Sequence, residues 1–179
     1  FYNLAIAQNK IGSFLESQNN YLEAIRIKKN YYQAYNNLGS IFIKTKKTHD
    51  AIKVLQRAIE IKPKYIEALT NLGVAYLELK KYQDALKYFN KALLVDPSYV
   101  RAISQRLFLM RKICDWSEDN ILEKNLKLIN NSKIDVTPWQ LLSLDDNPKT
   151  EFNRARKYGY QFGFKDFKST YKNLKIKLA

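Results

Sequence analysis

The stretch from residue 35 to residue 63 reads YNNLGSIFIKTKKTHDAIKVLQRAIEIKP, and a related stretch, LTNLGVAYLELKKYQDALKYFNKALLVDP, occupies residues 69–97. The two stretches align without gaps at an offset of 34 residues. Eight pairs of positions share this offset and carry identical or similar residues: Tyr35/Leu69, Leu38/Leu72, Gly39/Gly73, Phe42/Tyr76, Ala51/Ala85, Leu55/Phe89, Ala58/Ala92 and Pro63/Pro97. A fixed period of this length predicts a stack of helix-turn-helix units.

The residue types at the repeated positions explain how each unit packs. A glycine at positions 39 and 73 allows two antiparallel helices to approach closely, and the aromatic and leucine positions fill the space between them. Pro63 and Pro97 end the second helix of each unit, because proline cannot continue a helix. The sequence therefore predicts an all-α fold.

This pattern resembles the tetratricopeptide repeat, and the resemblance implies a solenoid that binds and positions other proteins. The repeat extends upstream, since Leu4-Ala5 lies one period before Leu38-Gly39, although Lys29 replaces the proline that ends the helix in the other units. We therefore expect residues 1–98 to form a solenoid of about three repeats, of which the first is partial.

The period breaks after residue 98. Arg106-Leu107 occupies the slot that holds Leu-Gly in the repeats. We interpret residues 99–116, which end in Cys114-Asp115-Trp116, as a helix that caps the last repeat, because a solenoid needs a terminal element to cover its apolar end.

Composition limits the class of protein. The 179 residues include no apolar run long enough to span a bilayer and no signal peptide, and the single cysteine excludes an intrachain disulfide. These features favour a cytoplasmic location and no membrane partner. The chain begins with Phe1 and ends in KIKLA, so we expect it to be a fragment of a longer protein.

The net charge of +14 raises the question of a nucleic-acid partner. Lysine supplies 24 of the 31 basic residues, and the excess is spread evenly, with +7 in residues 1–100 and +7 in residues 101–179. An arginine-rich stripe interleaved with aromatic residues, which single-strand binding favours, is absent from the sequence. We therefore predict no specific nucleic-acid partner.

One row of carboxamides recurs with the period. The predicted peptide-binding residues are Asn3, Asn37, Asn71 and, continuing the row, Gln105. Each carboxamide can both donate to and accept from a peptide backbone, so the row is suited to an extended ligand. The alternative, that asparagine is simply common in such repeats, stays open. A second inner row of mixed sign, which argues against a groove dedicated to an acidic tail, consists of Gln33, Glu67 and Arg101.

The segment after the repeats resembles the linker of SPINDLY-type O-linked N-acetylglucosamine transferases. The resemblance rests on Ile113-Cys114-Asp115-Trp116, on PWQLLSLDDNP at residues 138–148, on the helix pattern of residues 149–158 and on KIKLA at residues 175–179. It implies that residues 117–173 form a helical linker and that residues 174–179 begin the first strand of a missing α/β catalytic domain.

The same resemblance implies the chemistry of the parent protein. A sugar would pass from a nucleotide donor such as UDP-GlcNAc to serine or threonine of a protein, with every catalytic residue beyond Ala179. This chain itself is predicted to hold no catalytic residue, no metal and no cofactor. His49, Cys114 and the Asp145-Asp146 pair are interpreted as surface, packing and helix-capping residues, since each lacks suitable partners.

Two functions follow. The first is the substrate-binding and linker portion of a protein O-glycosyltransferase that holds extended protein segments. The alternative is a non-catalytic adaptor that assembles proteins. The sequence leaves open whether the parent is an enzyme and whether the solenoid forms a homodimer.

Overall fold

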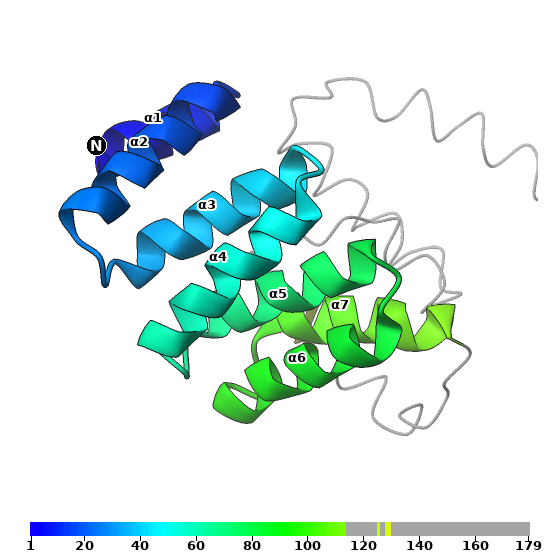
Figure 1. The fold of residues 1–179 in the computed structure, drawn as a ribbon. Coiled ribbons are helices and arrows are strands. Elements are labelled where there is room, and N and C mark those ends of the chain that lie inside the picture. Colours follow the sequence, from blue (N-terminus) through cyan, green and yellow to red (C-terminus); the bar gives the residue numbers. More distant parts are fainter. Residues whose placement is uncertain (114–124, 126–127, 130–179) are drawn as a thin grey trace, which may run out of the picture. The chain divides into compact units, whose positions relative to one another are not determined.

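The computed structural model describes residues 1–113, 125 and 128–129, and every regular element in this part of the chain is an α-helix. The helices are α1 (Tyr2–Lys10), α2 (Phe14–Ile27), α3 (Tyr32–Lys44), α4 (Thr48–Ile61), α5 (Ile66–Glu78), α6 (Tyr82–Val95) and α7 (Val100–Lys112). Figure 1 shows that α1 to α6 form three successive hairpins. The predicted all-α fold of stacked helix-turn-helix units is confirmed.

Each of the two full hairpins is closed at the predicted glycine. A Cβ atom added to Gly39 would lie 2.5 Å from Cγ of Leu55, and one added to Gly73 would lie 2.5 Å from Cε1 of Phe89. A Cβ atom at either position would force Leu55 or Phe89 to move, so glycine allows the second helix to place a large residue directly against the first.

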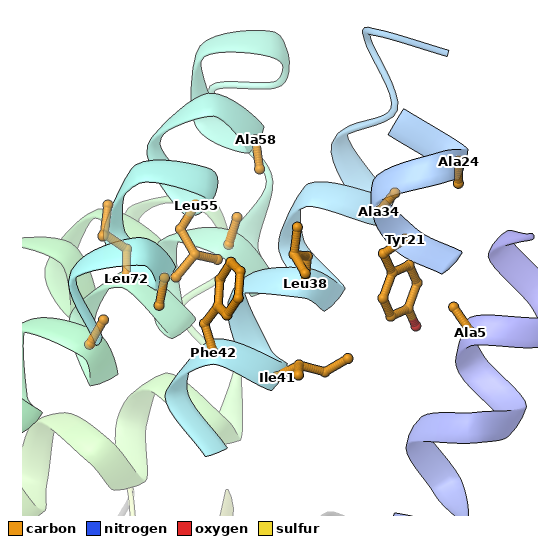
Figure 2. Packing of buried hydrophobic residues seen from close by; sticks show 13 residues of the cluster. Ala5, Tyr21, Ala24, Ala34, Leu38, Ile41, Phe42, Leu55, Ala58 and Leu72 are labelled. Carbon is orange, nitrogen blue, oxygen red and sulfur yellow. The ribbon is translucent and has the colours of Figure 1, made fainter. Parts of the chain in front are cut away.

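The hairpins stack through a continuous apolar core. The second helix of each hairpin contacts the first helix of the next, so α2 packs on α3 and α4 packs on α5, while α3 also contacts α5. Leu38, Leu55 and Leu72 are fully buried in this core, as Figure 2 shows. Burial of each leucine side chain contributes about 2 kcal/mol, so the core that joins the hairpins is the main source of stability.

The first hairpin departs from the repeat pattern at Ser17, where the other hairpins have alanine. The hydroxyl of Ser17 donates a hydrogen bond of 2.7 Å to the carbonyl oxygen of Ala5, and Ser17 is fully buried. A small residue with a satisfied hydroxyl fits here in place of alanine, because a buried polar group costs little when it is paired.

The turn inside each hairpin contains one residue in the left-handed region. These residues are Gly12 (φ 84°), Lys46 (φ 60°) and Lys80 (φ 59°), spaced one period apart. In each turn the next backbone N–H closes the helix end; for example, the N–H of Lys81 donates to the carbonyl of Tyr76 at 2.9 Å. This is the Schellman arrangement, which glycine adopts at the lowest cost.

The second helices end before the predicted prolines. Helix α4 ends at Ile61 and helix α6 ends at Val95, two residues before Pro63 and Pro97 respectively. Proline after the end of a helix is consistent with its inability to continue the helical hydrogen bonds.

Residues 1–109 form one compact unit, and Met110 begins a second. Within the first unit, Ala102 of α7 packs with Ala92 of α6 and Leu69 of α5, so α7 lies against the last hairpin. The Cys114-Asp115-Trp116 run lies outside the described residues. So do the predicted linker of residues 117–173, apart from residues 125, 128 and 129, which are helical, and the predicted strand of residues 174–179.

Replacing Lys80 by glycine should stabilise the fold. A lysine in the left-handed region carries a backbone strain of about 1 kcal/mol that glycine does not. We expect Lys80→Gly to raise the free energy of unfolding by about 0.5–1 kcal/mol in urea titrations. Lys81→Gly is the matched control, because Lys81 has a φ of −84°. Equal effects of the two substitutions would contradict the assignment of strain to residue 80.

Candidate functional site

The four predicted peptide-binding residues all lie on the first helices of the units. Asn3 of α1 is exposed, Asn37 of α3 and Gln105 of α7 are half-buried, and Asn71 of α5 is only 3% exposed. The row therefore passes from a solvent-facing side chain at one end to a buried one within three repeats. Asn71 is the member that a ligand can least reach.

Two members of the row belong to a chain of hydrogen bonds that crosses the hairpins. Nδ2 of Asn71 donates to Oδ1 of Asn36 at 2.9 Å, and Nδ2 of Asn36 donates to Oδ1 of Asn37 at 3.2 Å. Nδ2 of Asn37 then donates to the hydroxyl of Tyr2 at 3.1 Å. The chain joins α5, α3 and α1, so these carboxamides hold neighbouring repeats together.

Asn36 is absent from the predicted row, yet it links Asn71 to Asn37. A sequence signal for it exists. The residue immediately before each member of the row is polar throughout the chain and is half-buried or buried in the structure: Tyr2, Asn36, Thr70 and Ser104. A buried polar position that recurs with the repeat indicates a satisfied hydrogen bond. Tyr2 and Asn36 form that bond with a neighbouring repeat, whereas Thr70 and Ser104 donate to carbonyl oxygens of their own helices.

Tyrosines form the second feature of the candidate site. Tyr31, Tyr65 and Tyr99 recur at the 34-residue period, each just before a first helix. The ring of Tyr31 packs against Tyr2 with centroids 4.6 Å apart, and Tyr65 meets Tyr32 edge to face at 4.9 Å. Such pairs provide rigid apolar surface with a polar tip.

Lysines lie over two of these tyrosine groups. The ammonium nitrogen of Lys62 is 4.7 Å from the ring centroid of Tyr32 and 5.4 Å from that of Tyr65, and it also donates to the Tyr32 hydroxyl at 3.3 Å. Lys28 lies 5.1 Å from the centroid of Tyr31. These cation–π contacts fix the lysine side chains at the turns between hairpins.

The electrostatic surroundings keep the hydroxyls neutral. Burial raises the pKa of Tyr65 well above its ordinary value, and the nearby charge of Glu67 raises it further. Burial likewise raises the pKa of Tyr99, with Arg101 opposing and Glu67 adding to the shift. These tyrosines therefore present hydroxyl groups, rather than phenolates, at any physiological pH.

Metal-binding clusters and membrane-spanning helices were two further possibilities for the described part of the chain. Its residues include no group of three or more His, Cys, Asp or Glu side chains placed to hold a metal ion. His49 is an exposed residue in the first turn of α4. Among the helices that the structure describes, none has the length and apolar character needed to cross a membrane.

Two models of repeat families match part of this stack. Residues 66–99 match the family described as "Tetratricopeptide repeat", and residues 39–80 match one described as "TPR repeat". No curated protein sequence matches the chain. The repeat period predicted from residues 35–97 is thus that of the tetratricopeptide repeat, whereas nothing in these comparisons indicates a SPINDLY-type transferase.

Several solved structures share the fold. The structure "MamA 41-end from Desulfovibrio magneticus RS-1" is 21% identical with a TM-score of 0.64, covering 71% of this chain and 72% of that one. The "Arabidopsis OM64 TPR domain" is 24% identical with a TM-score of 0.59, covering 62% and 91%. The "First TPR of Spaghetti (RPAP3) bound to HSP90 peptide SRMEEVD" is 18% identical with a TM-score of 0.61, covering 63% and 90%.

The link between Asn71 and Asn36 can be measured by a double-mutant cycle. Asn71→Ala leaves the buried Asn36 oxygen without its donor, so we expect a loss of about 1–3 kcal/mol in the free energy of unfolding. The double variant with Asn36→Ala should lose less than the sum of the single variants, with a coupling of about 1 kcal/mol. Gln56→Ala, at an exposed site on α4, is the control. Strict additivity of the two asparagine variants would show that the bond does not contribute.

Proposed function

We propose that this tetratricopeptide solenoid binds an extended segment of a partner protein along the face formed by α1, α3, α5 and α7. Repeats of this kind are suited to protein–protein interaction. The observation that supports the proposal is the hydrogen-bond chain from Asn71 to Tyr2, because it joins α5, α3 and α1 along this face. A ligand that follows the row would meet the carboxamides of Asn3, Asn37 and Gln105, whereas Asn71 is buried.

The exposed and half-buried members of the row would contact the ligand directly. Asn3, Asn37 and Gln105 can each exchange hydrogen bonds with a peptide backbone, and each bond contributes about 1 kcal/mol net. Buried Asn71 would act by fixing the position of its neighbours. The half-buried tyrosines add apolar contact area, so recognition would depend little on the ligand's side chains.

Charge sets this face apart from one dedicated to an acidic terminus. In one of the similar structures, the first tetratricopeptide domain of Spaghetti (RPAP3) is bound to the HSP90 peptide SRMEEVD. In this chain the second inner row carries Glu67 as well as Arg101, and Glu67 has no ion-pair partner among the described residues. We therefore propose ligands that are extended but not predominantly acidic.

A binding titration tests this proposal. Fluorescence anisotropy would follow the association of a labelled library of unstructured 15-residue peptides with the chain. Asn3→Ala combined with Asn37→Ala removes about two hydrogen bonds, so we expect affinity to fall about tenfold or more. Gln56→Ala, exposed on the second helix α4, should leave affinity unchanged. Equal affinities for the double variant and the control would refute binding at this face.

We further propose that the parent polypeptide is a protein O-glycosyltransferase located in the cytoplasm, with this solenoid as its substrate-binding portion. The support is the order of segments that resemble the SPINDLY-type linker, which lies almost entirely outside the described residues. Binding through many weak contacts would suit an enzyme that modifies many proteins. A non-catalytic adaptor remains the second candidate, favoured by the match of the repeats alone.

Sugar transfer separates the two candidates. The parent protein would be incubated with radiolabelled UDP-GlcNAc or GDP-fucose and a protein acceptor, and transfer would be measured on serine and threonine. We expect transfer by the parent protein and none by the 179-residue chain. If the parent protein neither binds a nucleotide sugar nor transfers it, the glycosyltransferase proposal is refuted and the adaptor is the remaining candidate. The peptide-binding proposal is unaffected by that outcome.

A further inference from the structure

Exposed apolar side chains gather on the first hairpin. The described part of the chain has eight large hydrophobic residues that are exposed, and six of them lie within residues 1–27. These six are Phe1, Leu4, Ile11, Leu15, Leu22 and Ile27. A surface of this kind usually marks a contact with another molecule.

Part of this exposure follows from the position of α1 in the stack. Leu38 and Leu72 are completely buried because another hairpin lies before each of them, whereas Leu4, one period earlier, is 52% exposed. No described helix precedes α1, so the exposure of Leu4 reflects its place at the end of the described stack. Leu4 therefore does not identify a partner.

Leu15 and Leu22 of α2 need a different explanation. Leu15 is 65% exposed and Leu22 is 44% exposed. The residues at the equivalent positions of the other two hairpins are all polar and all exposed; they are His49 and Gln83 for Leu15, and Gln56 and Asn90 for Leu22. These positions stay exposed in both hairpins that have another hairpin before them, so another hairpin stacked before α1 would not cover the two leucines.

The two leucines and Asn19 form one stripe along α2. Their spacing of four and then three residues places them on the same side of the helix, and Asn19 is also exposed. Asn19 lies near the middle of the stripe, about one helical turn from each leucine. If a second copy of α2 runs antiparallel across it, Leu15 lies opposite Leu22 of the second copy and the two Asn19 carboxamides meet. A single asparagine between leucines is a known way to fix the register of paired helices.

Charge supports a second copy as the occupant. Residues 1–27 carry two basic and two acidic side chains, and are therefore neutral, whereas residues 28–61 carry +5 and residues 62–95 carry +3. Two chains of net charge +14 repel each other over most of their surface. The neutral hairpin is where they can approach, and its charged Glu23 and Arg26 already pair with each other at 2.9 Å.

We propose that the chain forms a homodimer in which α2 packs antiparallel against α2 of a second copy through Leu15, Asn19 and Leu22. The interface is isologous, as a two-fold axis requires, since the same stripe is used by both chains. This inference stands independently of peptide binding, because it uses α2 and the peptide-binding proposal uses α1, α3, α5 and α7.

Sedimentation equilibrium of the 179-residue chain over a range of concentrations tests the proposal. The wild-type chain should dimerise, and Leu15→Glu or Leu22→Glu should weaken dimerisation at least tenfold, because a charge then faces an apolar side chain. Leu94→Glu on α6, where the leucine is 84% exposed, is the matched control and should leave dimerisation unchanged. Circular dichroism would verify that each variant keeps its helices.

Two substitutions of Asn19 should change dimerisation in opposite directions. Asn19→Leu should strengthen dimerisation at least tenfold, and Asn19→Asp should weaken it, because two carboxylates would meet at the axis. A wild-type chain that stays monomeric at every concentration would overturn the proposal, and a foreign partner would then be the occupant of α2. Loss of the dimer in Leu94→Glu to the same extent as in Leu15→Glu would also overturn it.

Discussion

The close approach of the two helices at Gly39 and at Gly73 is the constraint on which the rest of the structure depends. The absence of a side chain at each glycine lets Leu55 or Phe89 reach the backbone of the first helix. That contact sets the distance between the helices of a hairpin, and the hairpin then presents its flank to the next one. The buried leucines Leu38, Leu55 and Leu72 pack between hairpins of this width.

Apolar contacts hold the stack together, and polar contacts favour one relative position of neighbouring hairpins. Burial of leucine and alanine is favourable in many relative positions of two hairpins, but a hydrogen bond such as the one from Asn71 to Asn36 is satisfied in only one. The asparagine chain therefore selects the register between repeats. The same bonds draw the carboxamides of Asn36 and Asn71 inward, so the stacking of the repeats and the composition of the face formed by their first helices have one physical origin.

The sequence predicts the hairpins well because their determinants are local and periodic. Glycine, alanine and proline at fixed positions define where each helix packs and ends, and the observed helix ends agree. The state of individual side chains on the inner face is less accessible to prediction. Asn3, Asn37 and Asn71 occupy the same position in three repeats. Asn3 is nevertheless exposed, Asn37 is half-buried and Asn71 is only 3% exposed, because exposure depends on the neighbouring hairpin. The left-handed lysines are a similar case, since the repeat has glycine at only one of the three positions.

The pairwise contacts along the chain, in which each hairpin meets chiefly the one before and the one after, also have a mechanical consequence. A globular core shares load among all its elements at once, whereas here tension applied at the two ends passes through one junction after another. Stretching would therefore open the junctions in succession and return them in succession. Such an array behaves as an elastic spacer, whose compliance increases with the number of repeats.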